Sequence, residues 1–196
     1  MIYIITACEI EARVLVERLG MQAADDLKFK VYRSQNTILV VGGIGKTASA
    51  AATAYLLTDG QVTGEDLCVN VGICGTAGSG EEIGKLEAIG EITDEGSGKK
   101  YFAAGPVGGL EKKSITCVDQ PMDMNAPGSC PKGLVDMESS GFFRAARCFL
   151  PPERISVLKV VSDCFSTEIP AEKFVLTLML DNAERMCRII LAGADC

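Results

Sequence analysis

The chain has no histidine among its 196 residues, although it contains nine cysteines. A zinc site is not expected, because neither a histidine nor a Cys-x-x-Cys pair is present to form one. The odd number of cysteines argues against a closed disulfide framework. A nucleophilic cysteine would lack the histidine base that normally activates it. We therefore expect reduced cysteines that mostly behave as small hydrophobic residues.

The chain also lacks an excess of basic charge and a long apolar run. Its net charge of −7 and pI of about 4.7 exclude the basic surface of a nucleic-acid-binding protein. No run approaches the about 18 consecutive apolar residues of a membrane helix. Glu9 and Glu11 interrupt the first apolar segment, so we do not expect a signal peptide. These features predict a cytoplasmic protein without nucleic-acid or membrane partners.

Strand-like and helix-like segments alternate along the chain. Amphipathic spacing after residue 9 ends at Gly20, and a run of small residues follows Lys46. Residues 121–133 are rich in proline and glycine and predict a loop. We expect one three-layer α/β/α domain with a central mixed sheet over residues 1–196. The expected strands are 1–7, 28–33, 37–41, 67–71, 86–92, 100–103, 114–118 and 155–161, and the expected helices are 10–19, 46–57, 141–149 and a long one after Pro170.

Acidic residues follow three apolar segments. Glu11 comes after the first strand, Glu138 follows Val135, and Asp163 directly follows strand 155–161. Open α/β sheets bind ligands outside the carboxyl ends of their strands. In a chain without histidine, this pattern predicts a site that works by carboxylate acid/base chemistry. Cysteines at positions 8, 74 and 164 adjoin the same strand ends and are candidates for the pocket lining.

Each acid also has an ordinary structural interpretation. Glu11 and Glu138 are typical of the first turn of a helix, where the helix dipole favours negative charge. Asp163 could cap the segment that follows its strand. The acids point to a function only through their joint occurrence with the glycine motifs.

The segment Gly43-Ile44-Gly45-Lys46-Thr47 superficially resembles nucleotide-binding motifs. A P-loop needs a further glycine where this chain has Val40. A dinucleotide fold needs an acidic residue at the end of the next strand, whereas Glu65 and Asp66 precede that strand. The segment instead predicts a tight turn before a helix, whose free N–H groups would suit an anion or a polar ligand.

Five motifs occur in a recognisable order: Ala7-Cys8-Glu9-Ile10-Glu11, Gly42-Gly43-Ile44-Gly45-Lys46, Asn70-Val71-Gly72-Ile73-Cys74-Gly75, Val135-Asp136-Met137-Glu138 and Ser162-Asp163. This series resembles the purine nucleoside phosphorylase/nucleosidase superfamily, and within it the 5'-methylthioadenosine/S-adenosylhomocysteine nucleosidases most. The resemblance extends over most of the chain, with a shortened region between about residues 93 and 133. It implies a nucleoside phosphorylase/hydrolase-like fold, a homodimer, and catalysis without a metal or organic cofactor.

The resemblance also implies the roles of individual residues. Asp163 would protonate the departing purine at N7, with Ser162 orienting it, and Glu11 would activate water at the anomeric carbon. Glu138 would hold the ribose 2' and 3' hydroxyls, with Met137 packing under the sugar. Further substrate-binding positions are Ile44, Cys74, Gly75 and Lys159, the last of which replaces an arginine that helps to place the water.

Water is the expected acceptor, but two alternatives stay open. Phosphorylases bind phosphate through an arginine and a serine at positions that are Asn70 and Ile73 here. A phosphorylase would need other phosphate ligands, such as Arg13 or Arg33. The changes at Ile73 and Lys159 would instead suit a nucleoside-binding protein without turnover.

The substrate is open as well. An aspartate at position 163 suits 6-aminopurines and also 6-oxopurines, and a futalosine-type substrate fits the same motifs. The phenylalanine that stacks on the purine in relatives has no counterpart at residues 119–122. Tyr101, Phe102 and Phe165 are the candidates to replace it.

Overall fold

The computed structural model describes residues 1–24, 28–78, 82–122, 133–165 and 170–194. The strands are β1 (Ile2–Thr6), β2 (Gln22–Ala24), β3 (Lys30–Arg33), β4 (Thr37–Val41), β5 (Leu67–Thr76), β6 (Leu86–Asp94), β7 (Lys100–Phe102), β8 (Lys112–Cys117), β9 (Leu134–Asp136) and β10 (Ile155–Asp163). The helices are α1 (Glu9–Arg18), α2 (Lys46–Asp59), α3 (Ser139–Ala146), the short 3-10 helix η2 (Pro152–Arg154) and α4 (Glu172–Ala194).

All ten strands belong to one sheet, in the order β10-β6-β8-β9-β5-β1-β4-β3-β2, with β7 paired to β6 and β10 also paired to β5. The pairs β1–β4, β1–β5 and β5–β10 are parallel, whereas β6 runs antiparallel to β10. The predicted mixed sheet is confirmed. Because β1, β5 and β10 run in the same direction, their carboxyl ends meet at one edge of the sheet.

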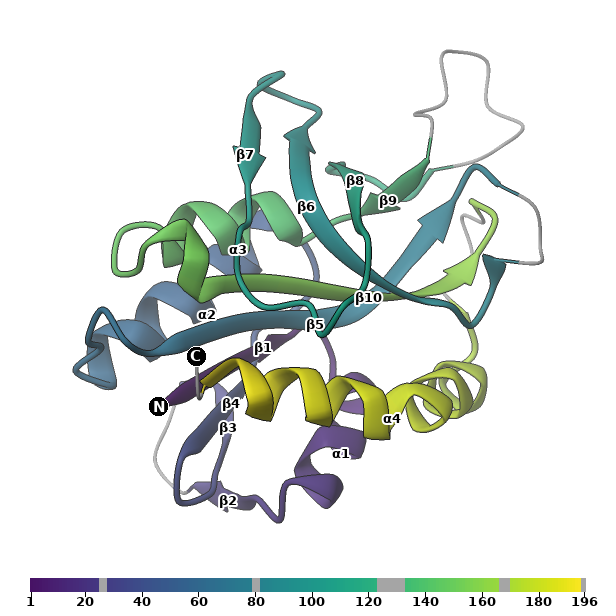
Figure 1. The fold of residues 1–196 in the computed structure, drawn as a ribbon. Helices are drawn as coiled ribbons and strands as arrows, with labels where there is room; N and C mark the ends of the chain where they lie inside the picture. Colours follow the sequence, from purple (N-terminus) through teal and green to yellow (C-terminus); the bar gives the residue numbers. More distant parts are fainter. Residues whose placement is uncertain (25–27, 79–81, 123–132, 166–169, 195–196) are drawn as a thin grey trace.

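Strand β1 explains how the sheet separates two helical layers. Its side chains alternate between the two faces, as in any strand. Tyr3 and Ile5 belong to the buried cluster that includes residues of α2 and α3, whereas Ile2 and Ile4 belong to the cluster that includes residues of α1 and α4. Figure 1 shows α1 and α4 together on one side of the sheet, with α2 and α3 on the other. The predicted three-layer α/β/α architecture is confirmed.

Strand β5 is longer than its sequence predicts. The expected strand ended at residue 71, but β5 continues through Gly72 and Gly75 to Thr76. Its second half pairs with β10 on one side and with Val135 of β9 on the other. A Cβ at Gly72 would lie 2.9 Å from Glu11 Oε1, and one at Gly75 would lie 3.0 Å from Asp163 Oδ1. Because these glycines have no side chain, two acidic side chains can pack close to β5, and the strand continues through both glycines.

Other boundaries differ from the predictions by a few residues. Strand β2 was not predicted, because a glutamine and two alanines, mostly exposed, show no apolar alternation and are held by pairing with β3. Helix α3 begins at Ser139, directly after Glu138, and ends at Ala146. Most of the loop predicted for residues 121–133 lies outside the described residues.

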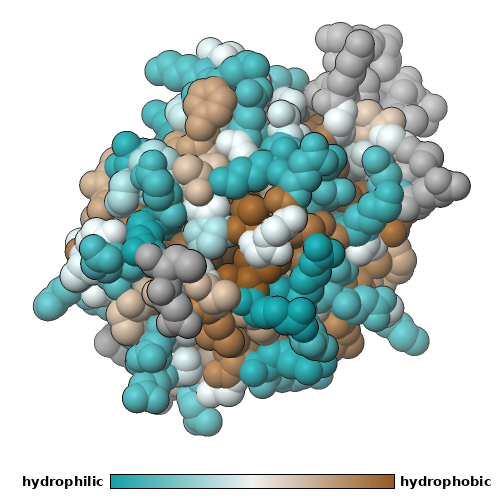
Figure 2. Space-filling model, viewed as in Figure 1, coloured by the Kyte–Doolittle hydropathy of each residue, from teal (hydrophilic) through white to brown (hydrophobic). Residues whose placement is uncertain are grey.

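The surface is mostly hydrophilic on the face drawn in Figure 2, where apolar side chains gather in a hollow near the middle. In the part of the chain that the structure describes, no helix is both long and apolar enough to cross a membrane.

Candidate functional site

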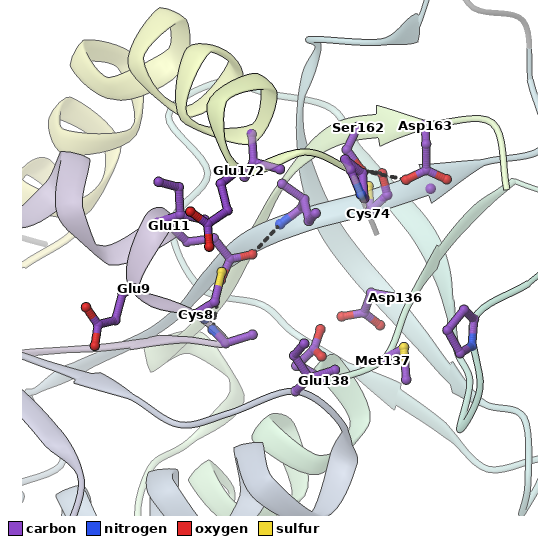
Figure 3. Close-up of a pocket in the computed structure, with 18 of the residues that line it drawn as sticks. Cys8, Glu9, Glu11, Cys74, Asp136, Met137, Glu138, Ser162, Asp163 and Glu172 are labelled. Atoms are coloured by element: carbon purple, nitrogen blue, oxygen red, sulfur yellow. Dashed lines mark hydrogen bonds between the residues drawn. The ribbon is translucent and has the colours of Figure 1, made fainter. Parts of the chain in front are cut away.

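A cavity of about 900 Å³ opens at the edge where β1, β5 and β10 end. Its wall contains eight of the nine predicted site residues, which come from five separate segments of the chain. The exception is Lys159, which is not among the lining residues. Figure 3 shows Glu11 and the Ser162–Asp163 pair on two sides of the pocket, with Met137 and Glu138 across from them. The eight are Glu11, Ile44, Cys74, Gly75, Met137, Glu138, Ser162 and Asp163.

Glu11 is held by three backbone N–H groups. Its Oε2 accepts hydrogen bonds from the N–H groups of Ala7 (2.8 Å) and Cys8 (3.1 Å). Its Oε1 accepts one from the N–H of Ile73 (3.1 Å), drawn as a dashed line in Figure 3. The side chain is thus both the capping acid of α1 and a cavity residue that bridges β1 and β5. Three donors fix the carboxylate in orientation while its remaining lone pairs can face the cavity.

Asp163 stands at the end of β10, next to Gly75 of β5. The pairing register shifts between Val161 and Asp163, so a bulge redirects the chain as it leaves the sheet. The Ser162 hydroxyl donates to Asp163 Oδ2 at 2.6 Å and lies 3.2 Å from the Cys74 carbonyl oxygen. Ser162 therefore connects the Asp163 carboxyl group to β5 and restricts its rotation.

Glu138 is anchored by the glycine turn before α2. Its Oε1 accepts a hydrogen bond of 2.9 Å from the N–H of Gly45, whose φ of 99° is in the left-handed region that favours glycine. The sequence predicted that N–H groups at the start of this helix would suit an anion, and the N–H of Gly45, directly before α2, binds the Glu138 carboxylate. Lys46 is also engaged, since its Nζ lies 3.1 Å from Asp94 Oδ2 and 3.2 Å from Asp119 Oδ1. The turn therefore binds the carboxylate of Glu138.

Lys159 lies behind the cavity wall, where it neutralises two acids. Its Nζ is 2.8 Å from Asp136 Oδ2 and 3.7 Å from Glu138 Oε2, and the residue is only 1% exposed. Asp136 also accepts hydrogen bonds from the N–H and the hydroxyl of Ser139. The resemblance implied a substrate-binding or water-placing role for Lys159, whereas the structure gives it contacts with Asp136 and Glu138.

Burial sets the ionisation of this cluster. Loss of hydration raises the pKa of Glu138 to about 7, although the charge of Lys159 and the N–H of Gly45 act in the opposite direction. Burial alone would lower the pKa of Lys159, but Asp136 and Glu138 outweigh it and the pKa is raised. Lys159 is therefore a permanent buried cation beside a carboxylate that is easily protonated.

The cavity has an apolar part next to Asp163. Phe165 is buried there with Val118 and Val135, and Met122 and Met137 pack against them. Of the three aromatic residues considered for stacking on the base, only Phe165 lines the cavity. Tyr101 packs against Phe143 at a ring-centroid distance of 5.7 Å, and Phe102 is 59% exposed on β7. Val118 and Met122 were not predicted, because nothing in their local sequence marks them.

The cysteines of the described residues are all free thiols. Cys8 and Cys74 line the cavity, but Cys164 is not in its wall. Burial and the nearby Glu11 raise the pKa of Cys8 to about 12, and burial raises the pKa of Cys74. Protonated thiols are poor nucleophiles, so the carboxylates carry the chemistry that this site can perform. Among the described residues, no group of three or more acidic or sulfur side chains could hold a metal ion.

No protein-family model and no curated protein matches the sequence. Solved structures do match it. The 5'-methylthioadenosine/S-adenosylhomocysteine nucleosidase of Helicobacter pylori, in complex with butyl-thio-DADMe-Immucillin-A, is 15% identical with a TM-score of 0.79 and 97% coverage of both chains. The corresponding nucleosidase of Streptococcus pneumoniae, with 8-aminoadenine, is 21% identical with a TM-score of 0.73, covering 98% of this chain and 97% of that one.

A mutant futalosine hydrolase of Helicobacter pylori also matches, with 15% identity, a TM-score of 0.73 and coverage of 99% of this chain and 97% of that one. At these identities the likeness concerns the fold. The nucleoside phosphorylase/hydrolase-like fold expected from the motifs is confirmed.

Proposed function

We propose that this protein hydrolyses the N-glycosidic bond of a purine nucleoside of the methylthioadenosine/adenosylhomocysteine type. The observation that carries the proposal is the meeting of Glu11, Glu138 and Asp163, from three distant segments, in one cavity with an apolar end. The shared fold with nucleosidases whose structures contain butyl-thio-DADMe-Immucillin-A and 8-aminoadenine supports it.

Cleavage of this bond needs an acid on the base and a nucleophile on the sugar. Asp163 delivers a proton to N7 of the purine, so that the electrons of the C1'–N9 bond leave with a neutral base. The ribosyl group then resembles an oxocarbenium ion. The Ser162 hydroxyl, 2.6 Å from Oδ2, keeps the carboxyl group in position for this transfer. Such proton transfer typically contributes about 10²–10⁴-fold to the rate.

Glu11 acts on the other side of the sugar. A water molecule attacks C1' and gives its proton to the Glu11 carboxylate, which leaves a free ribose derivative as the second product. The three N–H donors on Glu11 hold the carboxylate in one orientation and so favour one water position. Its negative charge also stabilises the positive charge that develops on the sugar.

Glu138 is suited to hold the sugar between these two groups. Its Oε1 is fixed by Gly45, and Met137 beside it offers an apolar surface to the ribose. Two vicinal hydroxyls can donate to one carboxylate, as in a bidentate contact. Substrate binding therefore favours the ionised form of Glu138.

Water is favoured over phosphate as the acceptor by the residues near the proposed attack site. Asn70 is buried and donates to the Ile5 carbonyl oxygen at 3.1 Å, away from the cavity lining. Arg33 pairs with Asp59 outside the cavity, and Arg13 at the cavity wall is paired with Glu17. A phosphate dianion would thus meet Glu11 with little compensating positive charge.

A futalosine-type nucleoside is the second candidate substrate, because the fold is shared with a futalosine hydrolase as well. The homodimer that the resemblance implies and the cytoplasmic location that the composition predicts both stay predictions.

The proposal is tested by incubating the protein with a panel of nucleosides and measuring free base by chromatography, with and without phosphate. The panel contains methylthioadenosine, adenosylhomocysteine, adenosine, inosine and futalosine. Phosphate-independent release of base identifies a hydrolase and its substrate. Strict dependence on phosphate would establish a phosphorylase, and tight binding without release would establish a nucleoside-binding protein.

A further inference from the structure

Phe165 has a backbone conformation that is unusual for a bulky residue. Its φ of 56° lies in the left-handed region, and apart from Gln61 it is the only non-glycine residue with positive φ among the described residues. This conformation is sterically unfavourable and typically persists where surrounding contacts impose it, often at ligand sites. The residue comes two positions after Asp163, is 5% exposed, and lines the cavity.

The ring of Phe165 lies beside the Asp163 carboxyl group. A Cβ built on Gly75 would be 3.0 Å from Asp163 Oδ1 and 3.0 Å from Phe165 Cδ1. The two side chains therefore approach β5 at the same glycine and are immediate neighbours. The chain turns sharply after Asp163, and the left-handed conformation at residue 165 brings the ring back beside the carboxyl group.

The surroundings of the ring fit the flat, apolar face of a heterocycle. Val118 and Val135 are buried against Phe165, and the flexible side chains of Met122 and Met137 complete the cluster. Methionine sulfur and aromatic rings both make favourable contacts with π systems. Asp163 lies at the edge of this cluster, where its carboxyl group could protonate a ring nitrogen.

We propose that Phe165 is the stacking wall for the purine base, placed by its left-handed backbone next to the group that protonates the base. This inference rests on the proposed nucleosidase function and assigns the surface that recognises its substrate. A purine whose N7 is hydrogen-bonded to Asp163 can lie over the adjacent apolar cluster, in which Phe165 is the aromatic member.

Tyr32 is the other aromatic residue in the cavity wall, but its position is unsuitable. It lies on β3, which is separated from β5 by β1 and β4. At about 4.8 Å per strand, this places β3 roughly 14 Å from the strand that carries Gly75. Tyr32 therefore belongs to the far end of the cavity, away from the proton donor.

The chain has no tryptophan, so a single substitution creates a specific fluorescent reporter. In Phe165→Trp, titration with adenine should quench the emission with a saturable curve, because the base stacks on the indole. Ribose alone should leave it unchanged. The matched control is Phe102→Trp on β7, whose side chain is 59% exposed and outside the cavity lining, and whose emission adenine should not change.

Affinity for adenine, measured by calorimetry, gives the second readout and covers the case in which the tryptophan variant fails to fold. Base stacking on an aromatic side chain is worth about 1–3 kcal/mol, so Phe165→Leu should weaken binding about 5- to 150-fold. Phe165→Tyr, which keeps the ring, should bind within about threefold of the original protein. Circular dichroism establishes that both variants are folded.

Two outcomes would overturn the inference in distinguishable ways. If the unmodified protein releases base from nucleosides but Phe165→Leu binds adenine as tightly as Phe165→Tyr, the stacking wall lies elsewhere and the proposed function stands. If the unmodified protein neither binds adenine nor releases base, the proposed function fails and the assignment of Phe165 fails with it.

Discussion

At the scale of single residues, the site depends on how three acids are held differently. Glu11 is fixed by backbone N–H groups, Asp163 by the hydroxyl of its neighbour, and Glu138 by one N–H and a buried lysine. In the proposed function, these environments let three carboxylates serve as base, acid and sugar ligand in a chain without histidine. The division of roles comes from the partners of each carboxylate.

The ionisation of Glu138 predicts how substrate binding depends on pH. Lys159, Asp136, Glu11 and the N–H of Gly45 surround it, and burial raises its pKa to about 7. Below this pH the free protein carries Glu138 protonated, so binding that needs the carboxylate must first expel the proton. We expect KM to rise by up to about tenfold per pH unit below pH 7, with a smaller effect on kcat. A KM that is constant between pH 5.5 and 8 would contradict this role.

Lys159 should contribute strongly to the stability of the fold because Asp136 has no other cation within ion-pair distance among the described residues. Removing one member of a buried ion pair leaves an uncompensated charge, which typically costs about 3–5 kcal/mol. We expect Lys159→Met to lower the free energy of unfolding in urea by this amount. The double variant Lys159→Met/Asp136→Asn should recover a large part of it, and equal losses in the single and double variants would refute the pairing.

At the scale of elements, the second half of β5 organises the site. Its glycines let Glu11 and Asp163 approach the strand from α1 and β10, and its pairing with β9 brings the 136–138 segment to the same edge. The sequence shows these glycines plainly, but local pattern alone suggests that they end the strand. Only the pairing partners, which are distant in sequence, reveal that the strand continues.

Gly75 provides a direct test of this arrangement. In Gly75→Ala the new methyl group would lie 3.0 Å from both Asp163 Oδ1 and Phe165 Cδ1, so these groups must shift by a few tenths of an ångström. Small displacements of catalytic groups are costly, and we expect kcat to fall about 10- to 100-fold. The matched control is Gly64→Ala, where a Cβ meets nothing within 4 Å and turnover should be unchanged. Equal rates in the two variants would show that Gly75 does not position the acid.

The positions of the acids could be predicted from the sequence more accurately than the positions of the residues around them. Glu11 and Asp163 could be found because each follows a recognisable apolar strand, and parallel strands bring their exits together. The position of Lys159 behind the cavity could not be found, since a lysine within an apolar strand gives no sign of the acids it will meet. Phe165 was one of three candidates, and its selection depended on a backbone turn that has no sequence signal.

At the scale of the whole molecule, the site lowers the stability of the fold. Glu138 has a raised pKa of about 7 in the folded protein, against an ordinary value of 4.5. Between these values the folded state binds more protons than the unfolded state, so the free energy of unfolding falls as pH rises from 4.5 to 7. Glu138 destabilises the folded protein by the full amount above pH 7 and does not destabilise it below pH 4.5.

Glu138→Gln should therefore be more stable than the unmodified protein at pH 8, on the order of 1–3 kcal/mol, although we expect it to bind substrate poorly. At pH 5 the difference should be much smaller, because Glu138 is then mostly protonated. Thermal unfolding of both proteins at the two pH values measures this directly. The burial argument would be wrong if the stability gain of Glu138→Gln over the original protein were smaller at pH 8 than at pH 5.

The rate of base release from methylthioadenosine without phosphate shows whether Asp163 and Glu11 are the acid and base of a hydrolase. We expect phosphate-independent release of adenine by the unmodified protein and losses of about 10²–10⁴-fold in both Asp163→Asn and Glu11→Gln, with both variants folded. Release that is unaffected by either substitution, or no release from the unmodified protein with any nucleoside of the panel, would contradict this assignment.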